Sequence, residues 1–129
     1  MILLSAKVLG IKIYTKKGCA GEALTTAQLT PEEGMVGNRH DDLCLLTATA
    51  QEFMKKADGM CFPRFKENLV VEGSLHDSGT LAVGDAILTI TGGKKFCFPE
   101  CAYFSEDGGC PMTGGVAFAR VVQGGTVAL

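Results

Sequence analysis

The sequence lacks both an excess of positive charge and a long apolar run. It carries 12 Lys and Arg residues against 14 Asp and Glu, a net charge of −2, and its basic residues are scattered along the chain. A nucleic-acid-binding protein usually shows a basic patch or stripe instead. No apolar stretch approaches the roughly 20 residues of a membrane-spanning helix. We therefore expect neither nucleic acid nor a membrane among its partners.

The apolar N-terminal stretch MILLSAKVLGIKIY also lacks the features of a signal peptide. Lys7 and Lys12 interrupt it, and no cleavage site made of small residues follows. We therefore expect a cytoplasmic protein. Because reducing cytosol keeps thiols free, the six cysteines are expected to be core residues, metal ligands or catalytic groups, and not disulfides.

Length and composition predict a single domain over residues 1–129. A chain of this length can bury about two thirds of the surface that its unfolded form exposes. It is 47% hydrophobic, with 17 glycines, 4 prolines and no tryptophan, and it contains no repeat or linker. These values are typical of an ordered, turn-rich globular domain.

Short apolar runs rich in β-branched residues predict strands. They lie at 7–14, 67–73, 80–92 and 115–125, and turns rich in Gly, Asp and Ser separate several of them. The turn-rich region 16–37 is expected to contain loop and strand. This spacing predicts a mainly β fold of the barrel or sandwich type. Because no long helical pattern alternates with the strands, a doubly wound α/β fold is not expected.

A helix is predicted over residues 47–59, in TATAQEFMKKADG. Thr49 and Glu52 have the spacing of a capping box at its start. Gly59 can end it, because glycine is the residue most often found just after a helix. The predicted helix is short.

Half of the cysteines fall in one segment, GGKKFCFPECAYFSEDGGCP, which holds Cys97, Cys101 and Cys110. A thiolate, and not a thiol, is the nucleophile and metal ligand, and a neighbouring cation lowers the pKa of a thiol. In an extended segment Lys95 and Cys97 point to the same side. The segment therefore predicts a reactive thiolate at Cys97, with Lys95 as its activator.

Two other interpretations of this cluster remain open. Isolated cysteines are often small buried hydrophobic residues. Alternatively, Cys97, Cys101 and Cys110 can bind structural zinc, with His40, His76 or a fourth cysteine completing the tetrahedron, although their spacing differs from paired C-x2-C knuckles. The remaining cysteines are expected to be ordinary core or turn residues: Cys19, Cys44 and Cys61.

Arg39 and His40 follow a glycine-flanked turn in GMVGNRH. Backbone N–H groups in such a turn, together with an arginine, can hold an anion. Arg64 and Lys66, in PRFKENL, can add positive charge to the same pocket. The alternative is that all four residues are solvated surface groups.

Two further polar residues are assigned structural roles. Asn68 can satisfy turn backbone through its side-chain amide. Asp85 follows a glycine before an apolar run, which is typical of a hairpin or loop. Neither residue is expected to act as an acid or base.

Four stretches, in order, are similar to a known family. The first three are EGMVGNRH, RFKENLVVEG and LAVGDAILTI. The fourth is GGKKFCFPECA, taken together with the later GGCPM and GVAFARVVQGG. They cover about residues 30–125. Together they resemble the MOSC domain, named for the C-terminal part of molybdenum cofactor sulfurase, in its short stand-alone bacterial members. The resemblance implies a β-barrel-like domain with a few short helices.

The resemblance also implies roles for the clustered cysteines. Cys97 corresponds to the family's characteristic cysteine, which is proposed to carry sulfur as a persulfide or to ligate molybdenum. Cys101 and Cys110 resemble the additional pair of the short members. Cys101 competes with Cys97 for the primary role, or resolves its persulfide as a disulfide.

The implied cofactor is the molybdenum cofactor (molybdopterin), with zinc as the less favoured alternative. The residues expected to bind its phosphate or to stabilise a sulfur anion are Arg39, His40, Arg64 and Lys95. The chain has no room for a pyridoxal-phosphate desulfurase domain, so the expected partner is a separate cysteine desulfurase or a molybdoenzyme. The expected function is that of a sulfur carrier or sulfurtransferase. Two alternatives are a non-catalytic cofactor carrier and a zinc-stabilised scaffold.

Overall fold

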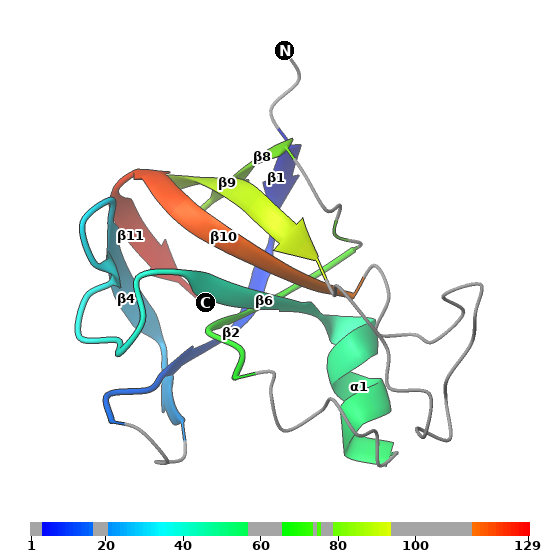
Figure 1. Ribbon diagram of the computed structural model, residues 1–129. Helices are drawn as coiled ribbons and strands as arrows, with labels where there is room; N and C mark the ends of the chain where they lie inside the picture. Colours follow the sequence, from blue (N-terminus) through cyan, green and yellow to red (C-terminus); the bar gives the residue numbers. More distant parts are fainter. Residues whose placement is uncertain (1–3, 17–20, 57–65, 74, 76–78, 94–114) are drawn as a thin grey trace.

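The structure is a computed structural model that describes residues 4–16, 21–56, 66–73, 75, 79–93 and 115–129. Within these ranges the protein is mainly β, with eleven strands and one helix (Figure 1). The mainly β, barrel-like fold predicted from the spacing of the apolar runs is confirmed. No helix in the described ranges combines the length and the apolar character needed to cross a bilayer.

Eight strands form one curled sheet (Figure 1). Their order across the sheet is β1-β8-β9-β10-β6-β7-β2-β3. Two neighbouring pairs are parallel, β1 with β8 and β6 with β7, and the other pairs are antiparallel. The strands are β1 (Leu4–Ala6), β2 (Val8–Ile13), β3 (Glu22–Leu24), β6 (Leu43–Thr47), β7 (Leu69–Val71), β8 (Gly79–Val83), β9 (Ala86–Gly93) and β10 (Val116–Gln123).

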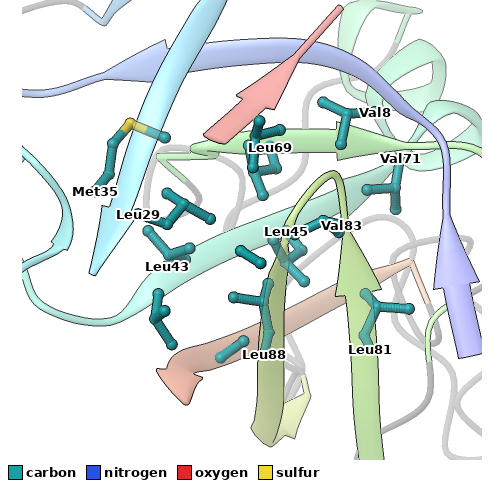
Figure 2. Close-up of a cluster of buried hydrophobic side chains, with 14 of the residues drawn as sticks. Val8, Leu29, Met35, Leu43, Leu45, Leu69, Val71, Leu81, Val83 and Leu88 are labelled. Carbon is teal, nitrogen blue, oxygen red and sulfur yellow. The ribbon is translucent and has the colours of Figure 1, made fainter. Parts of the chain in front are cut away.

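A smaller sheet of three antiparallel strands packs against the large one. Its order is β11-β4-β5, with β4 (Thr26–Thr30), β5 (Gly34–Met35) and β11 (Gly125–Ala128). Leu29 and Met35 of this sheet lie opposite Leu43 of the large sheet (Figure 2), and all three side chains are buried. The two sheets therefore share one hydrophobic core.

Alternation along the central strands decides which side chains reach that core. On β6, Leu43 and Leu45 belong to the core cluster, whereas Cys44 between them does not. On β10, Ala117 and Ala119 belong to the cluster, whereas Phe118 does not. Successive side chains of a strand point to opposite faces, so the residues left out of the core form the other face of the sheet.

A tight hairpin joins β8 and β9, as the Gly-Asp pair predicts. Val83 pairs with Ala86, so Gly84 and Asp85 alone form the loop. Gly84 has a φ of 55°, and a Cβ there would approach Thr126 O to 2.6 Å. Positive φ at the first loop residue suits a type II′ turn, for which glycine is the preferred residue. Asp85 N donates to Thr126 O at 3.1 Å and joins the hairpin to β11.

The predicted helix is present as α1 (Ala48–Lys56), directly after β6 (Figure 1). Its N-cap is Thr47 and not the predicted Thr49, because Thr47 Oγ1 accepts the backbone N–H of Ala50 at 3.1 Å. That bond satisfies one of the N–H groups that the first turn leaves without a helical partner. Glu52 instead pairs with Lys55 at 3.6 Å, on the exposed face. The predicted end at Gly59 lies outside the described residues.

Candidate functional site

A pocket of about 520 Å³ lies at the face of the large sheet that the core does not use. Phe118 and Cys44 are paired across β10 and β6, and both line it. Arg120, two residues further along β10, lines it from the same side. The remaining lining residues come from the chain after β2, the turn before β6 and the residues before β7: Tyr14, Lys16, Asn38, Arg39, His40, Asp41, Asp42, Lys66 and Asn68.

The pocket is richer in basic than in acidic side chains. It contains Lys16, Arg39, Lys66 and Arg120, together with His40, against two aspartates. Arg120 Nε donates to Asp42 Oδ1 at 3.2 Å, so its charge is already compensated. Among the described residues, no carboxylate forms an ion pair with any of the other three cations. The excess of basic over acidic side chains among the described lining residues favours an anionic ligand, although the whole chain is acidic.

Aromatic rings supply the apolar part of the pocket. Tyr14 and Phe118 both line it. Lys66 Nζ lies 5.8 Å from the centre of the Tyr14 ring, which is within the range of a cation–π interaction. A few polar groups beside aromatic walls are typical of sites for small molecules.

Two backbone hydrogen bonds, made by adjacent residues, fix the start of the turn that carries Arg39 and His40. Asn38 N donates to Met35 O at 2.9 Å, and Arg39 N donates to Tyr14 O at 2.7 Å. Gly37 adopts a φ of 88°, in the left-handed region where a side chain would be strained. The Gly-Asn pair therefore sets where the chain turns from the small sheet toward the pocket.

Side-chain amides tie the same turn to the sheet. Asn38 Oδ1 accepts the backbone N–H of Tyr14 at 2.9 Å, and its Nδ2 donates to His40 O at 3.1 Å. Asn68 Nδ2 donates to the same Asn38 oxygen at 3.1 Å. Asn68 also bonds to the backbone of Cys44 and Lys12. Its amide thus satisfies backbone groups as predicted, but those groups belong to β6 and β2 and not to a turn.

Cys44 lines the pocket but is not suited to nucleophilic chemistry. It is the free cysteine of the described residues, and it is buried. Burial, helped by the negative charge of Glu67, raises the pKa of its thiol from 9.0 to about 12. The thiol therefore stays protonated near neutral pH. This agrees with the prediction that Cys44 is an ordinary structural residue, and it is buried on the face of β6 opposite the core cluster.

We expect Cys44 to resist alkylation in the folded protein. At pH 8 iodoacetamide should modify it about a thousandfold more slowly than in urea, because its thiolate fraction is that much smaller when the pKa is raised from 9.0 to about 12. Peptide mapping by mass spectrometry separates Cys44 from the other cysteines. Equal rates in buffer and in urea would contradict the assignment.

The same raised pKa gives a sign for the dependence of stability on pH. Below pH 9 the Cys44 thiol is protonated in both the folded and the unfolded chain, so this group leaves the free energy of unfolding at its full value. Between pH 9 and about 12 only the unfolded chain releases this proton, and the free energy of unfolding falls as pH rises.

The structure brings together two of the residues predicted to bind cofactor, Arg39 and His40, and places Lys66 beside them. The other predicted site residues lie outside the described ranges: Arg64, Lys95, Cys97, Cys101 and Cys110. Among the described residues, no group of three or more His, Cys, Asp or Glu side chains is arranged to hold a metal ion.

Sequence reasoning missed several pocket residues. Arg120 had a usable signal, because it is a single charge within the apolar run GVAFARVV and stands two residues from Phe118. Tyr14 and Lys16 had no such signal in the sequence, because only the course of the chain after β2 brings them beside the turn at Arg39.

Comparison with known proteins supports the fold alone. No protein-family model matches the sequence, and no curated protein matches it. Among solved structures, the chain is similar to one described as the crystal structure of a hypothetical protein, with a TM-score of 0.55 and 21% sequence identity. The match covers 94% of this chain and 64% of that protein's chain. An identity this low carries no information about activity.

Proposed function

We propose that the protein is a sulfur carrier or sulfurtransferase associated with the molybdenum cofactor, as its resemblance to the MOSC domain implies. In this proposal Cys97 is the reactive thiol and the described pocket binds the anionic partner. The observation that carries the proposal is the surplus of basic over acidic side chains among the described lining residues, which include Arg39, His40 and Lys66. A thiolate and an anionic cofactor are both stabilised by such surroundings.

The strands beside the pocket also support the proposal. The segment with the three clustered cysteines is connected to β9 through Gly93 and to β10 through Gly115. Gly93 pairs with Ala117, whose neighbour Phe118 lines the pocket. Gly115 O accepts the backbone N–H of Thr47 at 2.9 Å, at the end of β6. One end of the segment is therefore attached to β10, which lines the pocket, and the other end is attached to β9, the neighbour of β10 in the large sheet.

The lining residues fit a molybdopterin-like cofactor in size and chemistry. A volume of about 520 Å³ falls within the range of small-molecule sites. Arg39, His40 and Lys66 would hold its phosphate by charge-assisted hydrogen bonds. Tyr14 and Phe118 would flank its ring system. When bound, the cofactor supplies a molybdenum centre, whereas the residues of this chain bind and orient it.

Sulfur transfer through Cys97 needs no external oxidant. The Cys97 thiolate attacks the outer sulfur of a cysteine persulfide on a donor protein such as a cysteine desulfurase. A new S–S bond forms on Cys97, the S–S bond of the donor breaks, and the donor leaves as a thiolate. Cys101 can then attack Cys97 Sγ, which forms a Cys97–Cys101 disulfide and releases hydrosulfide.

A non-catalytic cofactor carrier is the second candidate. It is favoured by one observation: within the described ranges, the thiol at the pocket, Cys44, is held protonated and cannot accept sulfur. In this case the cationic pocket supplies affinity, and the clustered cysteines only strengthen the binding of the cofactor.

Anaerobic purification followed by sulfur loading tests these candidates. We expect protein incubated with a cysteine desulfurase and cysteine to gain the mass of one sulfur atom, on a peptide containing Cys97, and to contain no zinc. Retention of cofactor without sulfur uptake would favour the carrier. Stoichiometric zinc with protected thiols would reject both candidates in favour of a zinc-stabilised scaffold.

A further inference from the structure

We propose that Asn68 is a positioning residue for the pocket, and that it acts through Asn38 on the turn that carries Arg39 and His40. The inference rests on the proposed anion-binding role of this pocket. It concerns how the backbone that carries Arg39 and His40 is held, and Asn68 itself need not touch the ligand.

Asn68 is anchored on two strands of the large sheet. Its side chain is buried, with only 3% of the residue exposed. Its backbone N–H donates to Cys44 O and its carbonyl accepts from Lys12 N, each at 2.8 Å. Its side-chain oxygen accepts the N–H of Cys44, and its Nδ2 donates to Lys12 O, each at 3.1 Å. Asn68 therefore cannot rotate without breaking bonds to both β6 and β2.

One hydrogen of the Asn68 amide remains for Asn38. Nδ2 carries two hydrogens; one is directed at Lys12 O and the other at Asn38 Oδ1, 3.1 Å away. Because Cys44 N–H is a donor, the Asn68 oxygen must face it, which leaves the NH₂ group on the side of Asn38. The hydrogen-bond partners thus fix the orientation of this amide without ambiguity.

Asn38 passes this constraint on to the turn. Its oxygen receives two donors, Tyr14 N and Asn68 Nδ2, so its NH₂ group must point the other way, toward His40 O. The adjacent Arg39 N–H is bonded to Tyr14 O at 2.7 Å. The backbone on both sides of the Arg39 side chain is therefore connected to the buried Asn68.

This connection matters because the side chains of Arg39 and His40 are exposed. Among the described residues, no hydrogen bond or ion pair of either side chain is present to hold it in place. Their position at the pocket depends on the backbone of the turn. A binding side chain whose backbone is already held in position loses less conformational entropy when it binds an anion.

A double-mutant cycle with inorganic phosphate as the probe tests the proposal. The variants are Asn38→Ala, Asn68→Ala and the double variant, and binding is followed by the NMR signals of the Arg39 and His40 amides. We expect each single variant to weaken phosphate binding about tenfold, as is usual for residues that orient a ligating side chain. The double variant should be no weaker than the worse single variant, because both act through one connection.

Thr47→Ala is the matched control. It removes the buried N-cap hydrogen bond to Ala50, and so lowers stability without changing the pocket. Its phosphate affinity should equal that of the unchanged protein. If the Asn68→Ala variant binds phosphate as well as the Thr47→Ala variant does, or if the losses in the cycle simply add, the proposal is overturned.

Hydrogen exchange separates this proposal from the proposed function. The Arg39 amide should exchange about tenfold faster in the Asn38→Ala and Asn68→Ala variants, and unchanged exchange overturns the positioning role. If phosphate causes no NMR shifts at Arg39 and His40 in the unchanged protein, the proposal that this pocket binds an anion is wrong. The exchange rates of the variants still decide whether Asn68 positions the turn. If Asn68→Ala fails to fold, two milder variants replace it: Asn68→Ser, and Asn38→Ala at a residue that is only half-buried. Their phosphate affinity and Arg39 amide exchange are compared in the same way.

Discussion

Replacement of Cys97 by serine should reduce sulfur uptake to background. Serine is close in size to cysteine, but its hydroxyl is not ionised near neutral pH and cannot displace a thiolate from a persulfide. After incubation with a cysteine desulfurase and cysteine, mass spectrometry should detect no added sulfur on the variant. Cyanolysis of the product, which releases persulfide sulfur as thiocyanate, gives an independent measurement.

The Cys44→Ala variant is the control for this experiment. Its thiol is buried and protonated, so its removal should leave sulfur uptake unchanged provided that the fold is retained. Cys101→Ser separates the roles within the cluster, because a resolving cysteine is needed to release hydrosulfide but not to accept sulfur. Unchanged uptake by Cys97→Ser, with uptake lost in Cys101→Ser, would move the primary role to Cys101.

Reversal of two charges in the pocket should nearly abolish anion binding. We expect the double variant Arg39→Glu, Lys66→Glu to bind inorganic phosphate at least about 100-fold more weakly. Each reversal turns an attraction into a repulsion, and at a few ångströms in a partly exposed site each is worth about 1.4 kcal/mol or more. Calorimetry at low ionic strength measures the loss, and added salt should weaken phosphate binding to the unchanged protein.

A control with the same change in net charge distinguishes local from general electrostatics. Lys7 and Lys55 are exposed and do not line the pocket, so the double variant Lys7→Glu, Lys55→Glu should keep most of the phosphate affinity. Comparable losses in both double variants would show that phosphate responds only to the overall charge. In that event the pocket around Arg39 is not the binding site.

Much of the fold could be predicted because its strongest local signals agree with the tertiary structure. The apolar runs at 7–14, 80–92 and 115–125 match β2, the β8–β9 hairpin and β10 to within a few residues at each end. The Gly-Asp pair fixes the hairpin by local turn chemistry. By contrast, β6 is buried along its whole length, and its sequence LCLLT shows no alternation that would distinguish a strand from a helix.

The helix shows how tertiary contacts can override a local pattern. Thr49 and Glu52 fit a capping box by spacing, yet Thr47 is the residue that caps α1. Thr47 is also the last residue of β6, where its N–H donates to Gly115 O. The pairing of β6 therefore sets where the strand stops and, with it, where the helix begins.

The site was less predictable than the fold. The glycine-flanked turn identified Arg39 and His40 because a local conformation places them. Tyr14 and Arg120 belong to the pocket only because β2 and β10 lie on either side of β6 and β7 in the large sheet. Strand order of this kind depends on non-local pairing, which no single stretch of sequence encodes.

The position of β10 has a consequence for synthesis on the ribosome. β10 separates β9 from β6 in the large sheet, but it is translated after both of them. Until it emerges, a nascent chain has two unpaired strand edges, and such edges readily join those of other chains. The sheet therefore cannot close progressively from the N-terminus, and its folding must await the last long strand.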